Sequence, residues 1–200
     1  MSKLIIIGGG GHAKVIADMA IKAGFDLLGF LDDNPSVDKI LGIKRLGFIS
    51  DCENFKDSSF VIGIGDSSVR EKIVDRYNLK YATIIHPSAI IGLGVEVGTG
   101  TVIMAGAVIN ADAKIGNHSI VNTSALVEHD CQIGDFSMLA PHSTVCGFSK
   151  IGNRCWIGAN AVVNNTIEIS DDITVGSGAA VVKNLTESGD YVGVPVRRIK

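Results

Sequence analysis

The chain has few cysteines, little net charge and no long apolar run, and each shortage argues against a class of protein. Its four cysteines form no CxxC motif and have no histidine at metal-ligand spacing, so no metal site is expected. The formal net charge is −3 and no basic run exceeds Arg197-Arg198, which argues against nucleic acid as a partner. No apolar stretch approaches the roughly 20 residues of a membrane span, and the apolar run at residues 4–7 stops at glycines, unlike a signal peptide. We therefore expect a cytoplasmic protein without a membrane partner.

The C-terminal part contains a strict repeat, in which an aliphatic anchor recurs at every sixth position and a small residue usually follows four positions later. A period of six fits neither an α-helix nor a simple strand alternation, and it is typical of a hexapeptide β-helix. The anchors are Ile85, Ile91, Val97, Ile103, Ile109, Ile115, Val121, Val127, Ile133, Leu139, Val145, Ile151, Ile157, Val163, Ile169, Val175 and Val181. Three units close one triangular coil, so this series predicts nearly six coils with the anchors and small residues inside. Glycine, asparagine or aspartate is expected at many corners, where φ is positive.

The N-terminal part is predicted to be a small α/β domain. Strands are expected over residues 3–7, 25–31 and 60–65, with helices over about 13–23 and 67–77 and with Ser67 or Ser68 capping the second helix. This order predicts a Rossmann-like sheet of parallel strands in residues 1–82. The β-helix and a C-terminal tail then occupy residues 83–200, so the predicted fold class is α/β followed by all-β.

A glycine turn follows the first strand. Gly8-x-Gly10-x-x-Ala13, with acids at Asp32 and Asp33, matches the dinucleotide-binding pattern in outline. The domain is too short for both halves of an NAD-binding fold, so we expect a single nucleotide on this turn. Asp32 or Asp33 would then bond its base or ribose. The alternative is a glycine-rich turn that is required only for packing.

His129 is the candidate general base of the repeat. It lies two residues after its anchor, where side chains point outward, and Asp130 follows it. An adjacent carboxylate orients a histidine ring and stabilises the imidazolium, so the pair can accept a proton near neutral pH. Gly147 lies 18 residues later, at the equivalent position of the next coil about 4.8 Å away, where its N–H is approachable. A base and an oxyanion donor at one crevice suit acyl transfer.

The other corner histidines and the inward cysteines are expected to be structural. His118 and His142 lie one place further round their corners, and His86 precedes a proline, so each is predicted to be a solvated or capping residue. Cys131 and Cys155 occupy the small inward position, which predicts buried, inert thiols.

Taken together, these motifs resemble the hexapeptide-repeat acyltransferases with an N-terminal nucleotide-binding domain, of PglD/NeuD type. The resemblance extends over essentially the whole chain and rests on residues 5–12, 30–33, 122–131, 133–137 and 191–195. It implies a left-handed β-helix and a homotrimer with active sites between neighbouring subunits. It also implies acetyl-CoA as the donor, with no metal.

The same resemblance implies a role for individual residues. His129 would take a proton from the sugar amine, Asp130 would raise its basicity, and the Gly147 N–H would bind the thioester carbonyl as it becomes an oxyanion. The residues implied to bind the nucleotide-linked amino sugar are Gly10, Gly11, His12, Asp32, Asp33, Gly65 and Asn122. Those implied to line the CoA site, besides Gly147, are Met138, Ala159 and Ser177.

Two positions differ from the relatives. Relatives that acetylate UDP-4-amino sugars can carry a second histidine nine residues after the base, where this chain has Met138, and this predicts a more apolar acyl pocket. Those relatives have Gly-Asn after the third strand, whereas this chain has Gly65-Asp66. A carboxylate there would repel a phosphate unless it faces the base or sugar, so a different nucleotide or sugar is expected.

The sequence therefore predicts an acetyl-CoA-dependent N-acetyltransferase for the 4-amino group of a nucleotide-linked amino-deoxysugar, serving bacterial surface glycan or glycoprotein synthesis. One alternative is a sialic-acid-type sugar O-acetyltransferase. Another is a non-catalytic, trimeric nucleotide-binding β-helix protein, and an NAD enzyme is the most distant.

Overall fold

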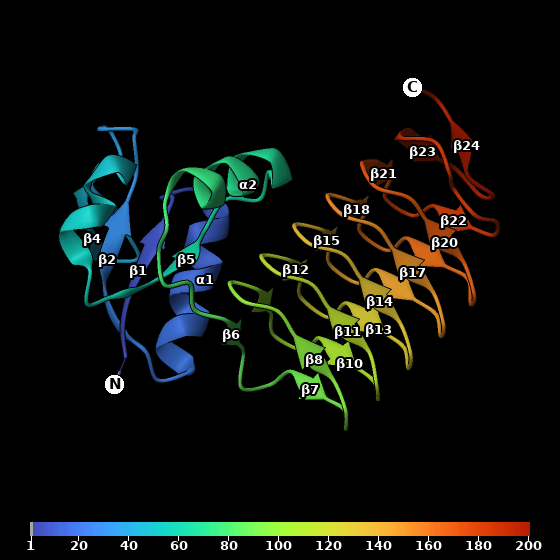
Figure 1. The fold of residues 1–200 in the computed structure, drawn as a ribbon, viewed down its shortest axis with the longest axis horizontal. Helices are drawn as coiled ribbons and strands as arrows, with labels where there is room; N and C mark the ends of the chain where they lie inside the picture. The colour runs from blue at the N-terminus through green and yellow to red at the C-terminus, as the bar shows by residue number, and fades with distance from the viewer. Residues whose placement is uncertain (1) are drawn as a thin grey trace. The chain divides into compact units, whose positions relative to one another are not determined.

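The computed structural model describes residues 2–200 and divides the chain into two compact units, Met1–Pro87 and Ser88–Lys200. The first unit mixes helices with a sheet, and the second consists of short strands in successive coils (Figure 1). The sequence places the division between residues 82 and 83.

The first unit is built on a five-stranded sheet of order β3-β4-β2-β1-β5. The strands pair in parallel except for β3 and β4, which form a short antiparallel hairpin. The elements are β1 (Lys3–Ile7), α1 (Gly11–Lys22), β2 (Asp26–Leu31), β3 (Lys39–Ile40), β4 (Ile43–Gly47), the 3₁₀ helix η1 (Ile49–Phe55), β5 (Ser59–Ile62) and α2 (Ser67–Arg76), and β6 (Ile84–Ile85) follows. The hairpin and η1 occupy the stretch for which the sequence predicts no regular element.

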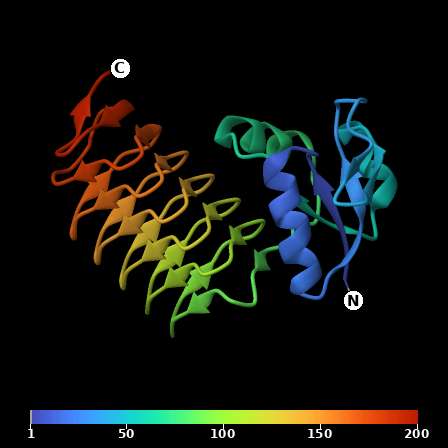
Figure 2. The same ribbon diagram turned by 180° about the vertical axis from the view of Figure 1, so that it is seen from behind.

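Helix α1 lies beside the sheet (Figure 2) and buries one apolar stripe that includes Ala13, Ile16, Ala17 and Ala20. Its contact with the sheet is close, because a Cβ on Gly63, just after β5, would lie 2.8 Å from the Ala13 Cβ. Helix α1 begins at Gly11, at the carboxyl edge of β1 and β5. This start is two residues earlier than the sequence predicts.

The cap of α2 differs from the prediction. Asp66, and not Ser67 or Ser68, is the N-cap residue, and its Oδ1 accepts from the Val69 N–H at 3.0 Å and from the Ser68 hydroxyl at 2.7 Å. These bonds lower the pKa of the Asp66 carboxyl, the hydroxyl of Ser68 having the largest effect.

The second unit is a left-handed parallel β-helix whose strands form three sheets along the coil axis. The six-stranded sheet holds β7 (Ile90–Ile91), β10 (Val108–Ile109), β13 (Leu126–Val127), β16 (Thr144–Val145), β19 (Val162–Val163) and β22 (Ala180–Val181). The five-stranded sheet holds β8 (Glu96–Val97), β11 (Lys114–Ile115), β14 (Gln132–Ile133), β17 (Lys150–Ile151) and β20 (Glu168–Ile169). Within the second unit, the strands of the third sheet are β9 (Val102–Ile103), β12 (Ile120–Val121), β15 (Met138–Leu139), β18 (Trp156–Ile157), β21 (Ile173–Val175), β23 (Gly189–Val192) and β24 (Arg197–Arg198).

The core of the β-helix follows the predicted period. From Ile103 onward the anchors are buried, and the small residues four positions later are buried with them. Where the small residue is a serine or threonine, its hydroxyl usually bonds a backbone carbonyl of the next coil, as Ser137 Oγ does with Gly152 O at 2.7 Å. The earlier anchor Ile91 stays 37% exposed, since β7 pairs with a neighbouring strand on one side only.

The corners use more residue types than the sequence predicts. From Ile91 to Val175 the third residue after each anchor has positive φ, and besides glycine, aspartate and asparagine this position holds larger residues such as His118, Phe136, Phe148 and Arg154. His118 is buried and stacks on Phe136, with ring centroids 5.3 Å apart, so of the two predicted roles, solvated or capping, the solvated one is wrong. The cysteines Cys131 and Cys155 are buried as predicted, and burial raises the pKa of the Cys155 thiol to about 11.

Candidate active site

One corner of the β-helix carries the predicted base. This histidine corner consists of the residues two positions after the strands of the six-stranded sheet: Leu93, Ala111, His129, Gly147, Asn165 and Lys183. Because Val127 of β13 pairs with Val145 of β16, His129 and Gly147 occupy the same position in successive coils.

His129 and Asp130 form a hydrogen-bonded pair. The Nδ1 atom of His129 lies 2.8 Å from Oδ2 of Asp130, and the Asp130 backbone has a φ of 59°, which turns its side chain back toward the ring. An ionised carboxylate can only accept, so Nδ1 donates and Nε2 keeps the lone pair. The His129 side chain is 50% exposed, which leaves it accessible to a substrate.

Gly147 lies directly against this ring. A Cβ on Gly147 would lie 2.9 Å from Cε1 and 3.0 Å from Nε2 of His129, so a larger residue would push the imidazole aside. The Gly147 N–H has no hydrogen-bond acceptor within residues 2–200, although its carbonyl accepts from the Thr166 N–H. A base nitrogen and a free N–H donor are therefore presented side by side.

Two further residues frame His129 and were missed by the sequence reasoning. The ring of Phe148 meets the imidazole edge to face, with centroids 5.1 Å apart and planes at 85°. The Oε2 atom of Glu128 accepts from the His129 N–H at 3.3 Å. The position of Phe148 in the repeat could have identified it, because an exposed aromatic residue with positive φ is unusual and this one follows Gly147 directly.

The residues implied to line the CoA site lie elsewhere on the coil. Ala159 and Ser177 follow β18 and β21 by two residues, which places them on a different corner from His129, across the six-stranded sheet. Met138 lies in β15 and is buried. Asn122 follows β12, and its Oδ1 accepts from the Thr123 N–H at 2.7 Å. One copy of the β-helix therefore does not bring these residues to His129.

The glycine turn between β1 and α1 has two different halves. Position 8 requires glycine because its φ is +105°. Position 9 requires glycine because a Cβ there would lie 2.6 Å from the Phe30 ring. Gly10 and Gly11 have open space where a Cβ would be, and neither has a positive φ. Packing within the chain therefore explains the first two glycines and not the last two.

The two acids after β2 bond the protein backbone. Asp32 accepts from the Gly9 N–H through Oδ2 and from the Asn34 N–H through Oδ1. Oδ1 of Asp33 accepts from the Ile49 N–H at 2.9 Å. Asp32 thus holds the glycine turn in place, and one oxygen of Asp33 has no bond that would occupy it within the described residues.

His12 and Arg70 lie close to the same turn. The Nε2 atom of His12 is buried and has no hydrogen-bond partner within residues 2–200. Burial, together with the positive charge of Arg70, lowers the pKa of His12 to about 4, so the ring is neutral at pH 7. Arg70 is buried and donates to the Gly65 carbonyl at 2.6 Å, and burial lowers its pKa to about 10.

Residues 2–200 contain no group of three or more histidine, cysteine or acidic side chains arranged to hold a metal ion. In the same part of the chain, no helix is long and apolar enough to span a membrane.

Comparison with known proteins identifies relatives of both units. Residues 3–77 match the model of the PglD N-terminal domain family. The structure of the acetyltransferase domain of PglB from Neisseria gonorrhoeae FA1090 superposes with a TM-score of 0.95, with 29% sequence identity and 100% coverage of both chains. That domain has also been solved in complex with acetyl coenzyme A.

A second solved relative is perosamine N-acetyltransferase from Caulobacter crescentus, a variant of which, with one histidine replaced by asparagine, was solved with CoA and GDP-perosamine. The TM-score is 0.93 and the identity 33%, over 100% of this chain and 98% of that one.

Among curated proteins, UDP-N-acetylbacillosamine N-acetyltransferase of Bacillus subtilis is 36% identical over 118 residues, which are 50% of this chain and 50% of that protein. An uncharacterized protein of Acanthamoeba polyphaga mimivirus is 38% identical over 101 residues, 47% of this chain and 21% of that protein. The chain thus spans between a fifth and half of the length of the curated relatives it matches.

Proposed function

The chain belongs to the PglD-type family of hexapeptide-repeat sugar acetyltransferases, and on that premise we propose that it transfers acetyl from acetyl-CoA to the 4-amino group of a nucleotide-linked amino-deoxysugar. The observation that carries this proposal is the histidine corner, where His129, bonded to Asp130, lies against the free N–H of Gly147. The proposed setting is the cytoplasm, where acetyl-CoA and nucleotide sugars are made.

The chemistry follows from the two groups at this corner. An ammonium ion has no lone pair, so the amine first loses one proton to solvent, and Nε2 of His129 accepts a second proton from the nitrogen as it attacks the thioester carbonyl. The Gly147 N–H donates to the oxygen that becomes negative, and Asp130 stabilises the imidazolium. The tetrahedral intermediate then breaks its C–S bond, and His129 returns the proton to the thiolate of CoA. The products are the acetamido sugar and free CoA.

The nucleotide is proposed to bind at the glycine turn of the first unit. Gly10 and Gly11 have no internal reason to be glycine, and this is expected where a ligand approaches the backbone at the start of a helix. The buried, unpartnered Nε2 of neutral His12 adds a donor or acceptor to the same place. Because Asp32 bonds two backbone N–H groups, Asp33 is the better candidate of the two to bond the base or ribose.

The assembly is proposed to be a homotrimer with acetyl-CoA between neighbouring β-helices. Two features support this. The corner of Ala159 and Ser177 and the histidine corner lie on opposite edges of the six-stranded sheet, so a second copy is needed to complete a site that includes both. The outward residues of that sheet are mostly apolar: Ile90, Val108, Leu126, Thr144, Val162 and Ala180.

Light scattering tests the trimer. Leu126→Asp, on the six-stranded sheet, should lower the molar mass in solution, whereas Gln132→Asp, on the five-stranded sheet of the same coil, should not. A wild-type mass of one chain would contradict the proposal.

A ligand panel tests the proposed reaction. Wild-type protein is mixed with acetyl-CoA and with UDP, GDP, dTDP and CMP, and the melting temperature is recorded. A ligand present at a hundredfold excess over its Kd stabilises the folded state by about 2.7 kcal/mol. We expect acetyl-CoA and one nucleotide diphosphate to raise the melting temperature, and the 4-amino sugar of that nucleotide to release CoA thiol.

The other outcomes identify the alternatives. A response to acetyl-CoA without any nucleotide would favour O-acetylation of a free sugar such as a sialic acid. Binding of a nucleotide without any acyl-CoA would indicate a non-catalytic nucleotide-binding protein.

A further inference from the structure

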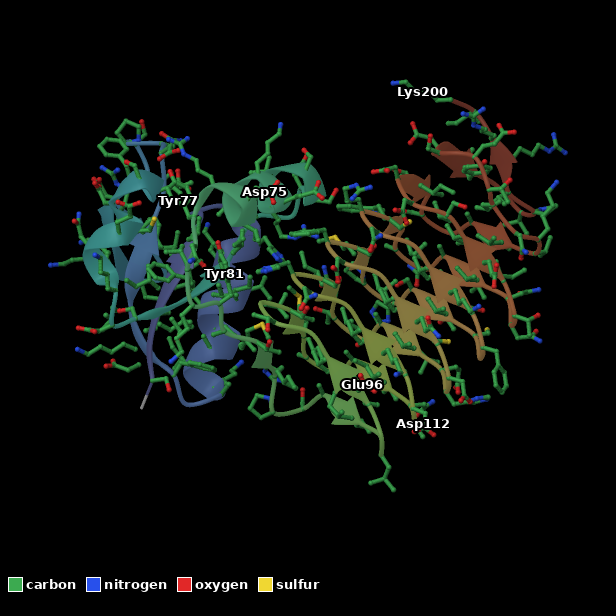
Figure 3. The ribbon with its side chains drawn as sticks, in the orientation of Figure 1. Asp75, Tyr77, Tyr81, Glu96, Asp112 and Lys200 are labelled. Atoms are coloured by element: carbon green, nitrogen blue, oxygen red, sulfur yellow. The ribbon has the colours of Figure 1, made fainter. Side chains whose placement is uncertain are left out.

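An exposed phenylalanine lies next to the candidate base. Phe148 directly follows Gly147, is 57% exposed and has a φ of 60°. A bulky residue rarely adopts positive φ, and an exposed phenyl ring loses the burial that usually stabilises this side chain. The equivalent residues of the neighbouring coils are polar: Asp112, Asp130 and Thr166. Figure 3 shows Asp112 at the outer edge of the coils.

A second phenylalanine at the same position of the repeat has an internal partner. Phe136 lies two six-residue units before Phe148 and stacks on the buried His118, with the ring planes 9° apart. Packing within the β-helix therefore explains Phe136. The ring contact of Phe148 is with His129, whose side chain is itself 50% exposed, so much of the phenyl surface stays open to a substrate.

Phe148 is held at a fixed place relative to the base. Its backbone N–H donates to the His129 carbonyl at 3.2 Å, and the two ring centroids are 5.1 Å apart. In the proposed reaction the acceptor amine meets Nε2 of this imidazole. The carbon atoms next to that amine are therefore within reach of the phenyl ring.

The groups around His129 suit different parts of an amino sugar. The carboxylates of Glu128 and Asp130 both accept hydrogen bonds from His129, and their negative charge attracts an ammonium group. The phenyl ring of Phe148 has no charge, and its electron-rich face packs against C–H groups. A pyranose ring exposes C–H groups on its faces, whereas the pantetheine arm of CoA is a thin chain that contains amides. The phenyl ring thus matches the acceptor sugar better than it matches the donor.

We propose that Phe148 is a specificity-determining residue that packs against the sugar ring of the acceptor, beside the reacting amine. This inference rests on the proposed function, since it assumes an amine at Nε2 of His129. Binding of the acceptor then has two separate parts. The nucleotide contributes affinity that does not depend on Phe148, and the sugar contributes affinity that does.

Calorimetry on the full-length protein tests this division. The ligands are UDP, GDP and dTDP, each as the free nucleotide and as its 4-amino-4,6-dideoxyhexose conjugate. Phe148→Asn should weaken binding of the preferred sugar nucleotide about 5- to 30-fold, the range for loss of an aromatic contact. The affinities for the free nucleotide and for acetyl-CoA should not change. Phe148→Tyr keeps the flat ring and should bind the sugar nucleotide nearly as well as wild type.

Phe136→Leu is the matched control, because it removes a ring from the same position of the repeat. This change should lower the melting temperature, since the stacking on His118 is lost, and leave the affinity for the sugar nucleotide unchanged. Phe148 is exposed, so its variants should melt at the wild-type temperature, which serves as the folding control.

Steady-state kinetics separates a sugar contact from a role in positioning His129 alone. The sugar contact predicts a higher KM for the sugar nucleotide in Phe148→Asn, with KM for acetyl-CoA unchanged. A lower kcat with wild-type affinity for the sugar nucleotide would mean that the ring acts only through the base, and would overturn the inference. Equal weakening of the free nucleotide and the sugar nucleotide would overturn it as well.

The same data distinguish this inference from the proposed function. Unchanged sugar-nucleotide affinity in Phe148→Asn, with acetyl transfer intact, would overturn the inference and leave the function standing. Sugar binding that depends on Phe148 without any acetyl transfer would support the contact and contradict the function. A wild-type protein that binds none of the sugar nucleotides would overturn both.

Discussion

Two corners of the same β-helix use one backbone position in opposite ways. The amide corner consists of the residues two positions after the strands of the five-stranded sheet: Thr99, Asn117, Asp135, Asn153 and Asp171. The N–H of each of the first four donates to a side-chain oxygen of the next coil. The four bonds measure 3.0, 2.6, 2.8 and 2.8 Å. In the histidine corner no such ladder exists among the described residues, and the Gly147 N–H is left free beside His129.

The difference lies in side chains and not in the coil. Both corners have the same offset of 18 residues between neighbours, and up to Thr166 and Asp172 the residue that follows each corner position has positive φ. In the amide corner the amide or carboxylate side chain turns back to accept from the N–H one coil before it, whereas Asn165, one coil after Gly147, makes no such bond within residues 2–200 and leaves a donor and a base open to a substrate. Changes at the two corners should therefore separate catalysis from stability.

The largest effect is expected for His129→Ala. Loss of the general base should lower kcat by roughly 10²–10⁴ and leave KM for acetyl-CoA nearly unchanged. Steady-state kinetics with thiol detection measures both constants, and Gln132→Ala, on the five-stranded sheet of the same coil, is the control. A large rise in KM with preserved kcat would remove His129 from the role of base.

Gly147→Ala should come next. The added Cβ would lie 2.9–3.0 Å from the His129 ring, so the ring must move and the N–H becomes less accessible. A displacement of this size should lower kcat about 10- to 100-fold. The same kinetic assay applies, with calorimetry to confirm that acetyl-CoA still binds. Full activity of this variant would contradict both the oxyanion role and the observed ring position.

Asp135→Ala tests the amide corner. This change removes the acceptor for the Asn117 N–H and should destabilise the fold by about 1 kcal/mol, as for loss of a helix cap, with kcat unchanged. Urea denaturation measures the free energy of unfolding, and the thiol assay measures kcat. A drop in kcat at unchanged stability would mean that the two corners are not functionally distinct.

The smallest effect is a pH dependence at the same corner. Hydrogen bonds from Arg154 lower the pKa of Asp172 below its usual value, so the pair stabilises the fold above a pH of about 3.9 and loses that effect as the pH falls through the lowered pKa. Asp172→Asn should cost less than about 1 kcal/mol at pH 7, because the pair is largely exposed. Urea denaturation of wild type and variant at pH 7 and pH 3 measures this effect. If the difference in unfolding free energy between them is larger at pH 3 than at pH 7, the predicted direction of the pH dependence is wrong.

Local sequence signals were sufficient for most of the fold but not for the irregular part of the first unit. β3 and η1 are short or weakly patterned, and their positions depend on pairing with β4 and on bonds such as Asp33 to the Ile49 N–H. The cap at Asp66 was missed because serine is an equally good cap, and only the observed bond to the Val69 N–H distinguishes them.

The candidate site shows the same limit. The 18-residue offset predicts that Gly147 lies one coil from His129. It does not predict the contact of Gly147 with the ring, the edge-to-face contact of Phe148, or the absence of an acceptor for the Gly147 N–H. The motif at Asp32 suggested a nucleotide contact, whereas the structure shows both oxygens bonded to the backbone of the chain itself.

The period of six with apolar anchors is enough to predict the β-helix, because a coil of three units is the fold that buries such anchors. The same period places His129, Asp130 and Gly147 at one corner. Which backbone groups of that corner stay free to bind a substrate depends on the packing of neighbouring coils. Hydrogen bonds between coils depend on side-chain reach and backbone direction at each position, and these are fixed only once neighbouring coils are in register. The free N–H of Gly147 beside the His129 ring is therefore a property of the folded chain.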